Sequence, residues 1–102
     1  MRYRVDVSSV AEEELREAKR YLEKHAPEYV SEWGARMRRA VLSLREMPHR
    51  CASAPEKDLF GLELRHLSVG SYRIVFHVEG KTVRVLYIRH SAMQPLDKAD
   101  EE

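Results

Sequence analysis

The segment from Leu64 to His90 constrains the fold more than any other part of the chain. It holds the runs LRHLSV, SYRIVFHV and VRVLYIRH, and a turn signal at Glu79-Gly80 separates the last two. Alternating side-chain character over runs of this length indicates β-strands, and a glycine between two runs favours a hairpin. We therefore expect two or three consecutive strands. In the middle run, one face should carry Tyr72, Ile74, Phe76 and Val78, and the other Arg73, Val75 and His77.

The first half of the chain is typical of one short strand followed by two helices. Arg2–Val7 alternates polar and apolar residues and predicts a strand. Ser9 followed by Glu12 forms a capping-box pattern, so a first helix should begin there and end before Pro27. A second apolar stripe at helical spacing follows and should end at Pro48. It comprises Val30, Trp33, Met37, Ala40, Val41, Leu44 and Met47.

These elements predict a single α+β domain over residues 1–102. The order is β-α-α-β-β-β, with a helical hairpin packed on one face of a small antiparallel or mixed sheet. Residues 48–61 predict an irregular connection, and residues 93–102 a weakly ordered acidic tail. The last six residues contain four acids and one lysine, a charge of −3, while the whole chain carries +1. The rest of the chain is therefore basic, at +4 by difference.

Several features argue against particular classes of protein. The N-terminal residues run directly into a strand pattern, with no long apolar segment of the kind found in signal peptides and membrane helices. The single cysteine, Cys51, cannot form an internal disulfide, so we expect a cytoplasmic protein without membrane partners. His49 lies near Cys51, but two ligands are too few for a zinc site. We therefore expect neither a metal nor another cofactor.

Basic side chains within the strands are the candidates for function. Guanidinium and imidazole groups repeated along one sheet face suit a phosphate-rich or acidic partner. A tyrosine beside them could orient a reacting group or stack on a nucleic-acid base. The candidates for binding a nucleic acid or another target are Arg65, His66, His77, Arg84, Tyr87 and Arg89.

The chain resembles the RelE/ParE superfamily, the toxins of type II toxin–antitoxin modules. The likeness covers nearly the whole chain, in the same element order. It rests on the paired helices with Trp33, on the exit at Leu44 and Pro48, and on LRHLSVGSYRIVFHV followed by a strand that ends in His90. The resemblance implies a toxin that arrests growth and is neutralised by a cognate antitoxin.

The branches of this superfamily differ in chemistry. RelE-like members cut messenger RNA on the ribosome, whereas ParE-like members inhibit DNA gyrase and are not nucleases. On the resemblance we expect a metal-independent mRNA interferase in which Arg73 stabilises the phosphate and His90 moves the proton. The alternatives are a gyrase inhibitor of the ParE type and a decayed toxin that only binds its antitoxin.

Each candidate residue also has a structural alternative. Arg73 could form an ion pair on the sheet face, with Glu63 as its partner. His90 could hydrogen-bond to the backbone at the end of its strand, and Tyr87 could fill the core with its hydroxyl at the rim. The rarity of unpaired arginine in mid-strand favours a functional role for Arg73, and both interpretations of His90 stay open.

Overall fold

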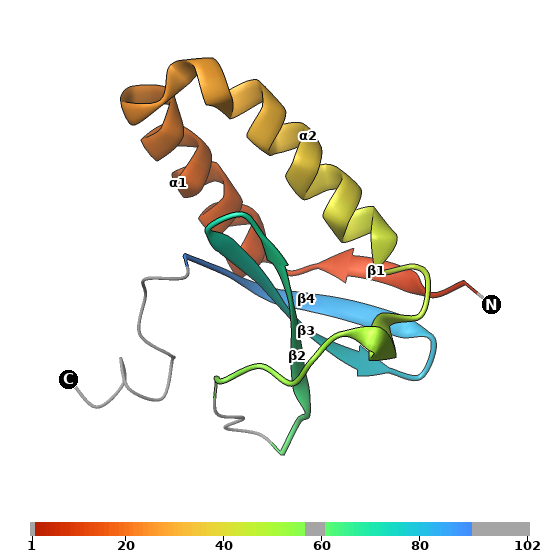
Figure 1. Ribbon diagram of the computed structural model, residues 1–102. Helices are drawn as coiled ribbons and strands as arrows, with labels where there is room; N and C mark the ends of the chain where they lie inside the picture. Colours follow the sequence, from red (N-terminus) through yellow and green to blue (C-terminus); the bar gives the residue numbers. More distant parts are fainter. Residues whose placement is uncertain (1, 57–60, 91–102) are drawn as a thin grey trace.

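The computed structural model describes residues 2–56 and 61–90 and has the predicted α+β architecture (Figure 1). The elements in chain order are β1 (Arg4–Val7), α1 (Ser9–His25), α2 (Pro27–Ser43), a 3₁₀ turn η1 (Pro48–Arg50), β2 (Leu64–Val69), β3 (Tyr72–Glu79) and β4 (Thr82–His90). The predicted β-α-α-β-β-β order is confirmed. The expected acidic tail, residues 93–102, lies outside the described residues.

The four strands form one mixed sheet in the order β1-β4-β3-β2. β2, β3 and β4 follow one another as antiparallel hairpins, whereas β1 pairs in parallel with the first half of β4. Gly70 and Gly80 have φ values of 59° and 60° in the two tight turns, a backbone conformation that favours glycine. The turn predicted at Glu79-Gly80 is confirmed.

The helical hairpin packs on one face of this sheet, and the hydrophobic core lies between them (Figure 1). β3 alternates as predicted, with Ile74 and Phe76 fully buried against the helices and Tyr72 and Val78 packed beside them. The helices contribute Ala11, Ala18, Trp33 and Met37. We call this side of the sheet the helix face and the opposite side the outer face.

The first helix begins at Ser9, as predicted, but its N-cap lies one residue earlier than the capping pattern indicated. Ser8 is the N-cap of α1, and its hydroxyl oxygen accepts the Ala11 N–H at 3.0 Å. Ser9 is already helical, so the predicted capping box at Ser9 and Glu12 is wrong. The cap lies at Ser8 because this residue still has an extended backbone, with ψ of 158°, at the end of β1.

The second helix is shorter than predicted. α2 ends at Ser43, and Met47 adopts a left-handed conformation with φ of 45°. Met47 precedes Pro48, and a residue before proline is sterically discouraged from the helical conformation. As a result 69 % of Met47 is exposed, and its predicted place on the apolar stripe is wrong.

A β-bulge in β4 decides which side chains face outward near the end of the sheet. The pairing of β3 with β4 shifts between Val75 and Phe76, so Leu86 is an extra residue in β4. One extra residue reverses the alternation beyond it. Tyr87 and Arg89 therefore turn to the outer face, and Ile88 and His90 turn to the helix face.

Ser8 ties this bulge to the start of α1. Its hydroxyl donates to the Leu86 carbonyl at 3.0 Å while accepting the Ala11 N–H, and its own N–H donates to the Val85 carbonyl at 2.9 Å. One residue thus fixes the first turn of α1 against the irregular part of β4.

Replacing Ser8 should therefore destabilise the protein through two losses, that of the helix cap and that of the hydrogen bond to the bulge. Ser8→Ala removes the acceptor for the Ala11 N–H and the donor to Leu86, and we expect a loss of about 1–2 kcal/mol in the free energy of unfolding. Urea unfolding followed by circular dichroism measures the change. Ser9→Ala is the matched control, and an equal loss in that variant would contradict the assignment of the cap.

Candidate functional site

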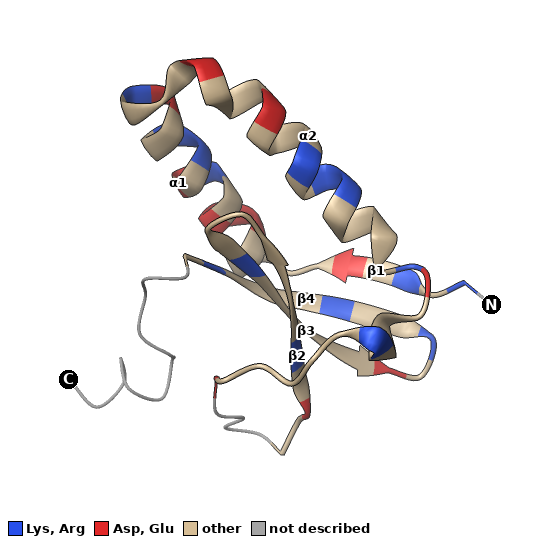
Figure 2. Ribbon diagram, viewed as in Figure 1, with Lys and Arg blue, Asp and Glu red and all other residues tan. Residues whose placement is uncertain are grey.

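The outer face of the sheet collects most of the predicted basic residues. Residues that are directly paired between neighbouring strands share a face, so the pairing defines rows that cross it. Figure 2 shows basic residues among the strands as well as along the second half of α2. Three of the rows are Arg89–Arg73–Ser68, Tyr87–Val75–His66 and Asp6–Arg84–His77–Leu64.

Arg73, at the centre of the first row, forms a buried ion pair with Glu56. Its two terminal nitrogens donate to the two carboxylate oxygens, with Nη1–Oε1 at 3.0 Å and Nη2–Oε2 at 2.5 Å. Only 8 % of Arg73 and 4 % of Glu56 are exposed. An ion pair was the structural alternative for Arg73, but Glu63 is the wrong partner, since it contacts Arg65 at 3.3 Å instead.

Glu56 reaches the outer face because the chain before it runs along the free edge of β2. The His66 N–H donates to the Ala52 carbonyl at 3.0 Å, and the Ala54 N–H donates to the Leu64 carbonyl at 2.8 Å. These backbone bonds extend the sheet by a short irregular segment. The segment carries the Glu56 carboxylate over the sheet and also covers the edge of β2.

Arg65 supports this segment from the other side of the sheet. It is paired with Phe76, so it lies on the helix face and not with the other candidates. Its Nη1 donates to the Cys51 carbonyl at 2.6 Å and to the His49 carbonyl at 3.3 Å. The structure therefore gives Arg65 a positioning contact that holds the chain leading to Glu56.

Burial and charge shift the pKa of Glu56 and of His66, which lies beside the ion pair. Burial disfavours the Glu56 carboxylate, but the hydrogen bonds and charge of Arg73, with a smaller effect of Arg89, lower the pKa of Glu56 overall. Burial, aided by the Arg73 charge, also lowers the pKa of His66. His66 Nδ1 lies 3.5 Å from Arg73 Nη1, so the imidazole sits beside the guanidinium at the limit of hydrogen bonding.

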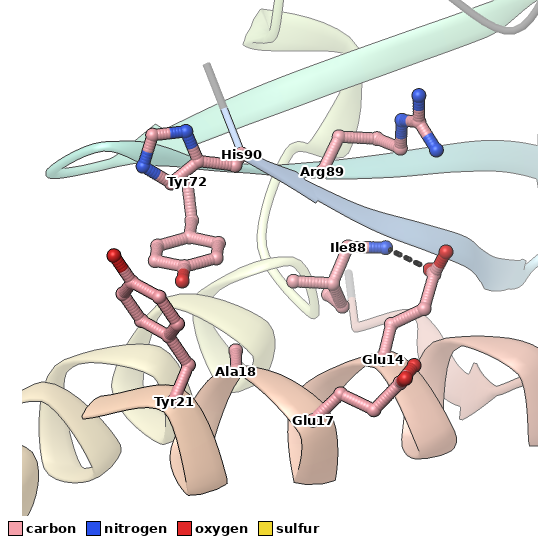
Figure 3. Close-up of a pocket in the computed structure, with 8 residues that line it drawn as sticks. All are labelled: Glu14, Glu17, Ala18, Tyr21, Tyr72, Ile88, Arg89 and His90. Carbon is pink, nitrogen blue, oxygen red and sulfur yellow. Dashed lines mark hydrogen bonds between the residues drawn. The ribbon is translucent and has the colours of Figure 1, made fainter. Parts of the chain in front are cut away.

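The two predicted catalytic residues lie on opposite faces of the sheet. Arg73 is paired with Arg89 on the outer face, whereas His90 is paired with Tyr72 on the helix face. The His90 ring packs edge-on against the Tyr72 ring, with centroids 5.0 Å apart and planes at 88° (Figure 3). The structure does not bring Arg73 and His90 together.

The other candidates on the outer face have weaker contacts. His77 Nδ1 lies 3.3 Å from the Glu63 carbonyl oxygen. Arg84 donates from Nε to an exposed Glu79 carboxylate at 2.9 Å, and Tyr87 is half-buried in the row beside them. These three side chains are the ones most able to contact another molecule.

Within residues 2–56 and 61–90, no group of three or more histidine, cysteine or acidic side chains is arranged to hold a metal. Among the same residues, no helix is both long and apolar enough to cross a membrane.

Sequence reasoning missed Glu56, which decides the chemistry of this face. The available signal was an arginine in mid-strand, which in a buried position needs an acidic partner. The identity of that partner depends on the path of the chain after Cys51, which no local pattern specifies.

Comparison with known proteins identifies one matching family and two similar structures. Residues 5–95 match the family of ParE toxins of type II toxin–antitoxin systems, parDE. A chromosomal ParDE toxin–antitoxin system from P. aeruginosa superposes with a TM-score of 0.71 at 18 % identity, over 86 % of this chain and 95 % of that one.

The second similar structure is the toxin–antitoxin complex RelBE2 from Mycobacterium tuberculosis. It superposes with a TM-score of 0.57 at 22 % identity, over 88 % of this chain and 99 % of that one. No curated protein matches the sequence. At these identities both structures establish that the fold is shared.

Breaking the buried ion pair should be costly. Glu56→Gln leaves the Arg73 guanidinium buried without its counter-charge, and we expect a loss of about 3–5 kcal/mol in the free energy of unfolding. Denaturant unfolding measures it. Glu79→Gln, which breaks the exposed pair with Arg84, is the control and should cost less than about 1 kcal/mol. Equal effects of the two changes would contradict the buried pair.

The same pair predicts a loss of stability in acid. The pKa of Glu56 is lower in the folded than in the unfolded state, so its contribution is complete above its usual value of 4.5. The contribution disappears as the pH falls through the folded-state value. The difference in unfolding free energy between wild type and Glu56→Gln should therefore shrink as the pH falls below 4.5 and through the folded-state pKa of Glu56. A difference that is constant with pH would contradict this account.

Proposed function

The chain belongs to the family of ParE toxins of type II toxin–antitoxin systems, and we propose that it arrests growth by binding DNA gyrase, without cutting RNA, unless a cognate antitoxin neutralises it. Membership of the family and the toxin–antitoxin complexes among the similar structures support the toxin and antitoxin parts of this proposal. The choice of gyrase over messenger RNA rests on the chemistry of the outer face.

The single observation that carries this choice is the neutralised guanidinium of Arg73. A scissile phosphate on the outer face would have to compete with a carboxylate that already makes two hydrogen bonds to Arg73 from a buried position. Displacing Glu56 would leave that carboxylate without its partner inside the protein, which is costly. Arg73 is thus better suited to holding the fold than to holding a transition state.

The placement of the ionisable groups supports the same choice. RNA cleavage needs a phosphate stabiliser and a proton-transfer group within reach of one phosphate. Arg73 and His90 point to opposite faces of one sheet, so a phosphate that touches one is separated from the other by the sheet. His66 is close to Arg73, but burial and the charge of Arg73 lower its pKa, so less of it carries the proton that a general acid must donate.

Binding of a protein target requires only an accessible surface. On the outer face, Arg84 is about half exposed, His77 is paired with it in the same row, and Tyr87 lies in the adjoining row. We propose that these three residues contribute to the contact with gyrase, with Arg84 as the principal charge. Arginine and tyrosine are the residue types that dominate protein–protein contacts.

Inducible expression tests the proposal directly. We expect growth arrest with signs of DNA damage, while the 5′ ends of transcripts within translated codons stay as they are in uninduced cells. New cuts inside codons would contradict the proposal and restore ribosome-dependent cleavage. Unimpaired growth without antitoxin would contradict it too and leave a chain that only binds antitoxin.

Purified gyrase tests the surface. Arg84→Ala should weaken inhibition of DNA supercoiling at least about fivefold, the equivalent of about 1 kcal/mol of binding free energy. Arg20→Ala removes an exposed arginine of α1 and is the matched control, expected to leave inhibition unchanged. Equal inhibition by wild type and Arg84→Ala would exclude the proposed contact.

A further inference from the structure

A pocket of about 460 Å³ lies on the helix face, between α1 and the end of β4 (Figure 3). It is separate from the outer face, since its walls come from the side of the sheet that carries the helices. We call it the α1–β4 pocket. The residues that line it are Glu14, Glu17, Ala18, Tyr21, Tyr72, Ile88, Arg89 and His90.

One end of the α1–β4 pocket is aromatic. Tyr21 is 58 % exposed, yet its ring is held by stacking on His25, with centroids 4.2 Å apart and planes at 19°. Tyr72 is held between His90 and Trp33, whose ring centroids lie 5.0 Å and 5.4 Å away. Aromatic rings that are exposed and already fixed in place lose little conformational entropy on binding.

The other end of the α1–β4 pocket is acidic. Glu14 accepts the Ile88 N–H through Oε1 at 2.7 Å, and Glu17 stands one turn further along α1. A carboxylate can accept more than one hydrogen bond, so Glu14 can still receive a donor from a ligand. Burial raises the pKa of Glu14, against the opposing effects of the Ile88 N–H and the Arg89 charge, and the charge of Glu17 adds a smaller increase. A cation at this end would relieve both penalties.

The apolar floor joins the two ends. Ala18 and Ile88 are buried between the tyrosines and the carboxylates. Arg89 also lines the pocket, but its side chain extends away from α1 (Figure 3) and lies in the outer-face row with Arg73. Its charge still acts to lower the pKa of Glu14, but one guanidinium against the carboxylates of Glu14 and Glu17 leaves the pocket with a net negative charge.

We propose that the α1–β4 pocket binds an arginine side chain of the antitoxin. The inference rests on the proposed function for its choice of partner. The aliphatic stem of an arginine would cover Ala18 and Ile88. Its guanidinium would stack on Tyr21 or Tyr72 and donate to Glu14 and Glu17.

Charge complementarity favours this occupant over others. A phosphate or an acidic side chain would be repelled by the two carboxylates, and a purely apolar side chain would cover them with Arg89 as their single counter-charge among the lining residues. The chain outside its acidic tail is basic, so an acidic pocket on its surface is distinctive. This pocket requires a basic residue at one defined position of the partner. The pocket would thus fix the register of the antitoxin and help to discriminate between antitoxins.

A peptide pair tests the chemistry. The probe is N-acetyl-Ala-Arg-Ala-amide, and its control replaces arginine with citrulline, which has the same shape without the charge. In ¹H–¹⁵N NMR titrations of the full chain, we expect the arginine peptide to shift the amides around Tyr21, Ile88 and His90. The citrulline peptide should bind at least about tenfold more weakly than the arginine peptide. Equal shifts with both peptides, or shifts centred elsewhere, would overturn the proposal.

Matched variants localise the effect. Glu17→Gln should weaken binding of the arginine peptide about tenfold, while Glu12→Gln, on the same helix but outside the pocket, should leave it unchanged. Glu17 is exposed, so its replacement does not threaten the fold. Unchanged peptide binding by Glu17→Gln would overturn the proposal.

Neutralisation in cells tests the choice of partner. With the cognate antitoxin co-expressed, Glu17→Gln should need a higher antitoxin dose than wild type to restore growth, and Glu12→Gln should not. An equal dose would overturn the assignment to the antitoxin. If wild type alone fails to arrest growth, the proposed function fails, while the peptide titration still decides the chemistry of the pocket.

Discussion

The buried ion pair between Arg73 and Glu56 is the interaction on which the chemistry of the outer face depends. A guanidinium enclosed in a sheet is stable only if a fixed counter-charge satisfies it, and here the carboxylate does so through two hydrogen bonds. The segment that delivers Glu56 is itself bonded to the edge of β2 and to the side chain of Arg65. The pair therefore couples the irregular segment after η1 to the centre of the sheet and removes one arginine from the surface.

The bulge at Leu86 divides the remaining functional groups between the two faces. If β4 continued beyond Val85 in regular pairing, Arg89 and His90 would exchange faces, and His90 would share the outer face with Arg73. With the bulge, Arg89 joins the outer face, where its charge helps to lower the pKa of Glu56, and His90 joins the aromatic end of the α1–β4 pocket. One irregularity thus separates a face suited to a protein target from a pocket suited to a basic side chain.

The fold could be predicted from the sequence, and the site only in part. Periodicity gave the element order, the alternation of β3 and the turn before Gly80, because these depend on local patterns. The cap lies at Ser8, the single residue between β1 and α1, whereas the capping-box pattern indicated Ser9 because only Ser9 has a glutamate three residues later. The partner of Arg73 and the face of His90 depend on a loop path and a bulge, and neither has a periodic signature in this chain.

The most direct test of the central claim is whether RNA touches the Arg73 guanidinium. The Nε–Hε resonance of Arg73 can be followed by ¹⁵N NMR while a short single-stranded RNA is added to the full chain, with the Arg84 resonance as an internal reference for the exposed surface. The account predicts that the Arg73 resonance stays in place throughout the titration, because Glu56 retains both hydrogen bonds. A saturable shift of the Arg73 resonance, accompanied by protonation or release of Glu56, would contradict it.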